Sequence, residues 1–128
     1  MPESVLFIED NIDDVFLTKR VLRKAGIAAI RVASDGQEGL DMLLTSAEPL
    51  PELLILDLRL PKINGLKVLA EIRRNKRTMA LPVLVLSSSE DPRDREACLH
   101  HGVLAFLNKP LELSQMLALF EPGGQAGN

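Results

Sequence analysis

One apolar run that ends on a carboxylate constrains the fold of this 128-residue chain most strongly. Residues 53–56 are all leucine or isoleucine, Asp57 follows them, and the turn residues Asn64-Gly65 come shortly after. A run of this length, closed by turn residues, is typical of a strand buried on both faces of a parallel sheet. Because open α/β sheets bind ligands at the carboxyl ends of their strands, Asp57 is predicted to lie at a binding edge.

Three further segments predict buried strands that also end in polar side chains. They are Val5–Ile8 before Glu9-Asp10, Val83–Leu86 before Ser87, and Val103–Leu107 before Asn108-Lys109-Pro110. Ala28–Ala33 predicts one more strand, with weaker alternation. If these strands are parallel neighbours, three carboxylates, one hydroxyl and one ammonium meet at a single edge of the sheet.

Helices are predicted between the strands, and they differ in how much apolar surface they bury. Start signals are the capping spacings Asn11–Asp14 and Asp35–Glu38 and the pair Asp91-Pro92. The first helix has an inner face of Leu17, Val21, Leu22 and Ala25, and Gly26 ends it. The helix at 92–101 has only Ala97, Cys98 and Leu99, so we expect it to be lightly anchored and free to shift.

Strands that alternate with helices predict an α/β fold, a doubly wound parallel sheet with right-handed crossovers. Two strand orders are plausible for five strands, and the order 2-1-3-4-5 places the switch point beside Asp10 and Asp57. The length fits one domain. We expect this domain to span residues 1–121 and a disordered tail to span 122–128.

Charge and composition argue against several classes of protein. A net charge of −3 and a pI near 5.4 argue against a nucleic-acid-binding face. A basic group does occur at Arg73, Arg74, Lys76 and Arg77, but it has no aromatic partners and is predicted to be the solvated end of a helix. The lone Cys98 excludes an intramolecular disulfide, and there is no signal peptide or apolar span, so a cytoplasmic protein is expected.

The predicted cluster of Glu9, Asp10 and Asp57 is suited to a divalent cation. Like charges in one pocket repel, which is costly unless a cation binds, and Mg²⁺ prefers oxygen ligands. Lys109 adds a fixed positive charge and Ser87 a hydrogen-bond donor. A cation and an ammonium beside one carboxylate favour phosphoryl transfer, in which Asp57 is the nucleophile. Asp13 and Asp14 are predicted to favour the helix N-terminus rather than to bind metal.

Five short segments together resemble the receiver domain of two-component response regulators. They are Phe7–Asn11, Leu56–Pro61, Asn64-Gly65, Leu86–Ser88 and Asn108–Pro110. Each is weak alone, but the order and spacing of all five are specific, and the resemblance extends to about Phe120. It implies a flavodoxin-like fold of five βα units with strand order 2-1-3-4-5. The opening and the Asp57 segment look most like single-domain, chemotaxis-like regulators that accompany bacteriophytochrome kinases.

The resemblance also implies roles for individual residues. Asp57 would accept the phosphoryl group, Lys109 would pair with it, and Ser87 would be the switch hydroxyl. Mg²⁺, or Mn²⁺, would be bound by Asp57, by Asp10 directly, by Glu9 through water and by the backbone carbonyl of Arg59. The peptide bond between Lys109 and Pro110 is expected to be cis. Phe106 would be the switch aromatic, at a position where family members often have Tyr.

These roles imply a stand-alone response regulator of a phosphorelay. A histidine kinase or phosphotransfer protein, such as a bacteriophytochrome, would phosphorylate it, and a downstream protein would read a Mg²⁺-dependent switch. The domain would be a monomer or a phosphorylation-dependent homodimer. It would catalyse only its own phosphorylation and dephosphorylation.

Two other function classes compete with this interpretation. A phosphatase or phosphotransferase with an aspartyl phosphate generally needs a second Asp two residues after the nucleophile, where this chain has Arg59. A flavodoxin-like cofactor binder needs a glycine- or hydroxyl-rich loop after the first strand, where Glu9-Asp10 would repel a phosphate.

Overall fold

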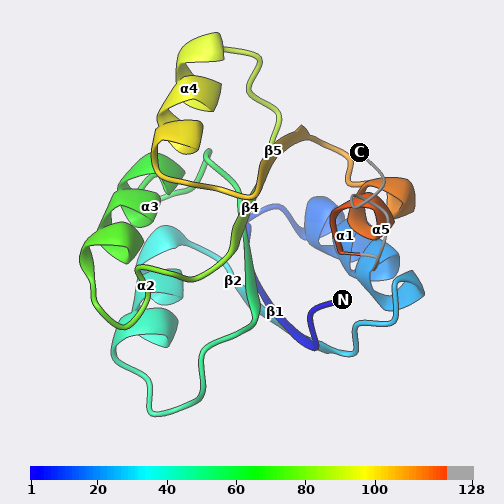
Figure 1. The fold of residues 1–128 in the computed structure, drawn as a ribbon, viewed down its shortest axis with the longest axis horizontal. Coiled ribbons are helices and arrows are strands. Elements are labelled where there is room, and N and C mark those ends of the chain that lie inside the picture. The colour runs from blue at the N-terminus through cyan, green and yellow to red at the C-terminus, as the bar shows by residue number, and fades with distance from the viewer. Residues whose placement is uncertain (121–128) are drawn as a thin grey trace.

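Five parallel strands form one sheet in the order β2-β1-β3-β4-β5, as the family resemblance implies (Figure 1). The computed structural model describes residues 1–120, so the predicted tail at 122–128 lies outside the described residues. The strands are β1 (Ser4–Ile8), β2 (Ala29–Ala33), β3 (Leu53–Leu56), β4 (Val83–Ser87) and β5 (Ala105–Asn108). The helices are α1 (Ile12–Lys24), α2 (Gly36–Leu44), α3 (Gly65–Arg74), α4 (Pro92–His100) and α5 (Leu113–Phe120).

The helices cover both faces of the sheet: α1 and α5 lie on one side, and α2, α3 and α4 on the other (Figure 1). Each strand contributes alternate residues to the two sides, so Leu54 packs in the core under α2 and α3, and Ile55 in the core under α1 and α5. All four residues of β3 are completely buried. The central strand therefore holds its carboxyl end, and the Asp57 that follows, in a fixed place.

The helix starts follow the sequence signals. The side chains of Asn11, Asp35, Asn64 and Asp91 each accept a hydrogen bond from a backbone N–H in the first turn of the helix that follows. Gly26, with φ of +92°, follows the last turn of α1 in the left-handed conformation that glycine adopts without strain. All four caps lie in loops that follow the carboxyl ends of strands, after β1, β2, β3 and β4.

One expectation about side-chain exposure is wrong, and a second is incomplete. Leu17, predicted on the inner face of α1, is half exposed, because Thr18 and Leu22 face the core instead. The basic group is not simply solvated. Arg73 donates hydrogen bonds to backbone carbonyls after α4, and Arg77 donates to the carbonyls of Leu43 and Glu48. Arg73 at the end of α3 and Arg77 in the turn after it thus contact distant backbone.

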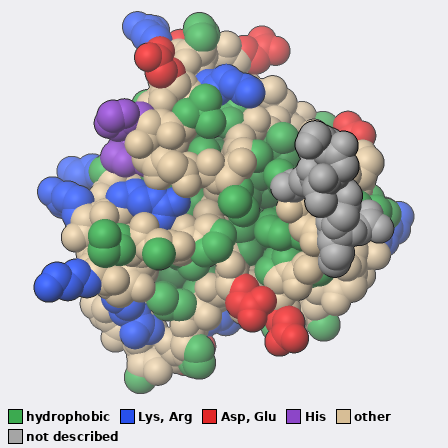
Figure 2. Space-filling view, in the orientation of Figure 1, with side chains coloured by type: hydrophobic (Ala, Val, Ile, Leu, Met, Phe, Trp, Pro, Cys, Tyr) green, Lys and Arg blue, Asp and Glu red, His purple; other side chains and the backbone are tan. Residues whose placement is uncertain are grey.

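The edge strand β5 lies between α4 and α5 on the face shown in Figure 2, where hydrophobic side chains gather along the middle. Leu104, just before β5, is half exposed, while Phe106 within it is buried. Among the described residues, no helix is long and apolar enough to cross a membrane.

Candidate functional site

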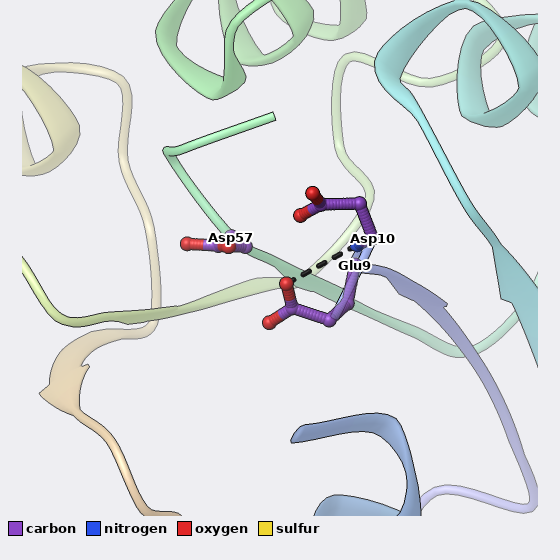
Figure 3. Close-up of side chains that lie close together, drawn as sticks. All are labelled: Glu9, Asp10 and Asp57. Carbon is purple, nitrogen blue, oxygen red and sulfur yellow. Dashed lines mark hydrogen bonds between the residues drawn. The ribbon is translucent and has the colours of Figure 1, made fainter. Parts of the chain in front are cut away.

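Three carboxylates meet at the carboxyl edge of the sheet, as their positions after β1 and β3 predict (Figure 3). The register pairs Ile8 with Leu56, so the next residues, Glu9 and Asp57, leave adjacent strands side by side. One oxygen from each of Glu9, Asp10 and Asp57 lies within 4.8 Å of the others. Glu9 and Asp57 are buried and Asp10 is exposed, so the cluster is open to solvent on one side.

Lys109 reaches this cluster from the end of β5. Its Nζ lies 2.5 Å from Glu9 Oε1, 2.8 Å from Asp14 Oδ2 and 3.2 Å from Asp57 Oδ2. The contacts to Asp14 and Asp57 are hydrogen bonds, whereas Glu9 Oε1 makes an ion pair without hydrogen-bond geometry. The Lys109-Pro110 peptide bond is cis, as expected. One ammonium therefore balances part of the charge of several carboxylates.

Asp14 is a member of the cluster that the sequence analysis missed. It was assigned only to the N-terminus of α1, yet its carboxylate shares Lys109 with Asp57. The signal was its spacing: the Asn11 side chain accepts from the Asp14 N–H, so Asp14 lies in the first turn of a helix that begins beside Asp10. A residue in that turn returns toward the same edge of the sheet.

The pKa values of Glu9 and Lys109 are both raised, for different reasons. Burial raises the pKa of Glu9 to about 7; Lys109 opposes this shift and Asp57 adds to it. Burial alone would lower the pKa of Lys109, but the hydrogen bond that it donates to Asp14, its close contact with Glu9 and the charge of Asp57 outweigh burial and raise that pKa. Lys109 is therefore charged at neutral pH, whereas Glu9 is partly protonated there without a metal ion.

The backbone around Asp57 is fixed by a close approach of α3. A Cβ on Gly65 would lie 2.4 Å from the Asp57 carbonyl oxygen, so only glycine fits at the start of this helix. The Arg59 N–H donates to Asp57 Oδ1 at 3.2 Å. The Arg59 side chain is largely exposed, with Nη2 4.0 Å from Asp94 Oδ2. The assignment of its backbone carbonyl as a metal ligand stays a prediction.

Ser87 and Phe106 lie on neighbouring strands beside the cluster. Ser87 is buried at the end of β4, and its Oγ accepts a hydrogen bond from the Ser89 N–H at 3.1 Å. Phe106 is also buried, and the guanidinium of Arg95 lies 5.8 Å from the centre of its ring. These contacts show the positions of the Ser87 and Phe106 side chains. Their roles in a conformational switch stay predictions.

A comparison with protein families decides what kind of domain this is. The family model described as response regulator receiver domain matches residues 5–121. The chain belongs to the receiver-domain family. Receiver domains are signalling domains of two-component systems, so the resemblance seen in the sequence is confirmed.

The receiver domain is similar to single-domain regulators over nearly all of its length. The structure of the bacteriophytochrome response regulator AtBRR is 34% identical, with a TM-score of 0.81, covering 93% of this chain and 90% of that chain. Probable methanogenesis regulatory protein FilR2 of Methanothrix harundinacea is 34% identical over 119 residues, covering 90% of this chain and 77% of that protein.

Response regulator Rcp1 of Synechocystis is 32% identical over 125 residues, covering 94% of this chain and 85% of that protein. The Mn²⁺-bound structure of Rcp1 has a TM-score of 0.79 and 32% identity to this receiver domain, covering 92% of this chain and 88% of that chain.

The donor atoms of the receiver domain fit a hard divalent cation. The cluster offers only carboxylate oxygens, which Mg²⁺ and Mn²⁺ prefer. Glu9 Oε1 is buried and pairs with the Lys109 ammonium, while the other carboxylate oxygens of the cluster keep lone pairs that a cation can use. Asp10 is exposed on the open side, where an ion can enter.

Proposed function

We propose that this receiver domain accepts a phosphoryl group on Asp57 from a histidine kinase or phosphotransfer protein. The observation that carries the proposal is the contact between Lys109 Nζ and Asp57 Oδ2, at 3.2 Å, inside an acidic cluster with one open side. A carboxylate oxygen can act directly as the nucleophile toward phosphorus and form an aspartyl phosphate. The ammonium is positioned to offset the charge of an incoming phosphoryl group.

Transfer of the phosphoryl group to Asp57 forms one bond to phosphorus and breaks one. A carboxylate oxygen of Asp57 forms a bond to phosphorus while the bond between phosphorus and the donor's imidazole nitrogen breaks. The nitrogen keeps that electron pair and takes a proton from solvent. Lys109 remains protonated throughout, because its raised pKa keeps it charged at neutral pH.

The proposed metal ligands are Asp10, Asp57, the backbone carbonyl of Arg59 and, through water, Glu9. Bound there, Mg²⁺ or Mn²⁺ would neutralise part of the charge on the phosphoryl oxygens. The protein's own groups orient the acceptor: the Arg59 N–H holds Oδ1 of Asp57 and Lys109 holds Oδ2. Each acceptor oxygen therefore has a defined partner before the donor arrives.

Phosphorylation is proposed to act as a switch. A phosphoryl group adds about −1.5 to −2 charge and strong acceptor oxygens. Ser87 would leave its hydrogen bond with the Ser89 N–H to donate to these oxygens, and Phe106 would move into the space it leaves. The surface of α4 and β5 would then differ for a downstream protein.

The phosphodonor is proposed to be a histidine-bearing domain that covers the start of α1. Ile12 and Phe16 are 83% and 60% exposed, and Ile12 comes two residues after Asp10. A donor that delivers a phosphoryl group to Asp57 must lie over this edge, so these apolar side chains offer it a contact surface. Similarity to bacteriophytochrome response regulators supports a bacteriophytochrome as that kinase.

We propose no turnover on an external substrate. The residue two positions after Asp57 is Arg59, whose guanidinium is always protonated and cannot serve as a general acid or base. The domain would catalyse only its own phosphorylation and the hydrolysis of its own acyl phosphate.

The test is the intact mass of the protein after incubation with a small acyl phosphate and Mg²⁺. The wild type is expected to gain one phosphoryl group, and Asp57→Asn none. Asp41→Asn, an exposed carboxylate on α2 away from the cluster, is the matched control and should gain mass like the wild type. No gain in the wild type, or an equal gain in Asp57→Asn, would contradict the proposal.

A further inference from the structure

Ser89 connects the end of β4 to helix α4 through buried hydrogen bonds. It is 5% exposed, although its sequence context is a polar loop. Its N–H donates to Ser87 Oγ at 3.1 Å, and its own Oγ donates to Asp94 Oδ2 at 2.5 Å and accepts from the Asp91 N–H at 3.3 Å. Ser87 is therefore linked to the first turn of α4 through one residue.

Asp57 is also connected to Asp94 Oδ2, through Arg59. The Arg59 N–H donates to Asp57 Oδ1 at 3.2 Å, and Arg59 Nη2 lies 4.0 Å from Asp94 Oδ2. A residue of the loop after β3 and a residue of the loop after β4 thus both contact the same atom, Oδ2 of Asp94. Asp94 is partly buried, with 24% of its side chain exposed, whereas the Arg59 side chain that it faces is 67% exposed.

The two ends of α4 are held differently. Cys98 is the only fully buried residue of the helix. Beyond its C-terminal end, Arg73 donates to the carbonyls of His101 at 2.6 Å and Gly102 at 3.3 Å. Near its N-terminal end lies a pocket of about 320 Å³, lined by Leu58, Arg59, Asn64, Leu66, Asp91 and Asp94. The N-terminal end of α4 has little apolar packing, and the polar contacts of Asp94 connect it to the loops after β3 and β4.

We propose that Asp94 is the positioning residue through which phosphorylation of Asp57 acts on α4. The inference rests on the proposed function. A phosphoryl group on Asp57 carries more charge than the Asp94 carboxylate, so it competes with Asp94 for the Arg59 guanidinium. When Ser87 turns toward the phosphoryl oxygens, it leaves the Ser89 N–H and shifts the backbone that holds Ser89 Oγ on Asp94. Asp94 Oδ2 then loses both its contact with Arg59 and its hydrogen bond from Ser89.

The consequence is a pivot of α4. Its N-terminal end is released, while Arg73 keeps holding the carbonyls beyond its C-terminal end. Release is cheap for Asp94 itself, because a carboxylate in the first turn of a helix is favoured by the helix dipole. A downstream protein would therefore read a change at the first turn of α4, next to the cation–π contact of Arg95 with Phe106.

Amide hydrogen exchange of the full chain, with and without a small acyl phosphate and Mg²⁺, tests this inference, and intact mass reports phosphorylation in each sample. In the wild type, phosphorylation is expected to speed exchange in the first turn of α4 about tenfold, as for loss of a hydrogen bond to a charged acceptor. Asp94→Ala is expected to gain the same mass, to exchange fast there already, and to change by less than about twofold on phosphorylation.

Two further variants separate coupling from a merely structural role. Glu96→Ala removes an exposed acid from the same helix and should respond like the wild type. Asp94→Asn keeps an acceptor for Ser89 Oγ but removes the charge that faces Arg59, so its response should be intermediate. The inference is overturned if α4 exchanges faster in Asp94→Ala but phosphorylation still changes its exchange rate by the same factor as in the wild type.

The failure of this inference differs from the failure of the proposed function. A wild type that gains mass without any change in exchange at α4 would overturn the role of Asp94 alone. A wild type that gains no mass would overturn the proposed function, and the role of Asp94 with it.

Discussion

Strand β3 and helix α4 lie on either side of the same site and are held in opposite ways. Every residue of β3 is buried, and the strand pairs with β1 on one side and β4 on the other, whereas α4 buries only Cys98 and relies on polar contacts near its ends. The acceptor Asp57 follows the rigid element, and the surface proposed to change is carried by the loose one. In this receiver domain the proposed phosphoryl group would therefore bind next to a rigid strand, and the proposed conformational change would occur in a loosely packed helix.

The largest expected effect tests that difference in packing directly. Ile55→Ala removes buried methyl groups from the middle of β3 and should lower the free energy of unfolding by about 2–5 kcal/mol. Leu99→Ala, in the half-exposed part of α4, should change it by less than about 0.5 kcal/mol. Chemical denaturation measures both. Similar losses in the two variants would show that α4 is as tightly packed as β3.

A second substitution tests the hold on the C-terminal side of α4. Arg73→Lys keeps the charge but cannot reach the carbonyls of Met79, Leu81, His101 and Gly102 together. We expect a loss of about 2 kcal/mol in unfolding free energy, since several backbone carbonyls, two of them in part-buried hydrogen bonds, lose a charged donor. Arg74→Lys, whose side chain pairs with Glu71 at the surface, is the control and should be nearly neutral. Equal effects of the two changes would remove Arg73 as the anchor.

The raised pKa of Glu9, which lies beside the rigid strand β3, predicts how the affinity for Mg²⁺ depends on pH. Burial raises that pKa to about 7, and protonation of Glu9 removes the negative charge that it would offer, through water, to a divalent cation. The affinity for Mg²⁺ should therefore rise about tenfold per pH unit from pH 5 to 7 and level off above that range. Isothermal titration calorimetry measures it. In Glu9→Gln, this step should be absent, and a step of wild-type size there would assign the proton to another group.

The smallest expected effect concerns the contact between α4 and β5. Arg95→Met removes the cation that lies 5.8 Å from the ring centre of Phe106, and should cost about 0.5–1 kcal/mol of unfolding free energy. Lys76→Met, at an exposed position after α3, is the control. A stabilised Arg95→Met protein would show that the guanidinium does not favour the buried position of the ring.

The sequence predicts well what depends on local spacing and burial. The apolar run of β3, the cap of Asn11 on Asp14 and the thin apolar stripe of α4 each follow from residues close together in the chain. The meeting of Glu9, Asp10 and Asp57 followed from the rule that parallel strands end at a common edge. The strand order came from the family resemblance.

The contacts that the sequence could not provide join long side chains to distant backbone or charge. Asp14 and Lys109 are 95 residues apart, and Arg73 reaches a carbonyl 28 residues away. Periodicity predicts which face of a helix a residue lies on, but not which partner a flexible side chain selects. The same limit hid the role of Ser89, because a serine in a polar loop has no pattern that distinguishes a buried hydrogen-bonding residue from a solvated one.

The most direct test of the central claim locates the phosphoryl group on the chain. Wild-type protein is treated with a small acyl phosphate and Mg²⁺, quenched quickly, digested and analysed by tandem mass spectrometry. The account predicts a phosphoryl group on Asp57, in an amount that falls when Mg²⁺ is chelated. A phosphoryl group on Asp10, Asp14 or a histidine, or one that forms on Asp57 equally well without a divalent ion, would contradict it.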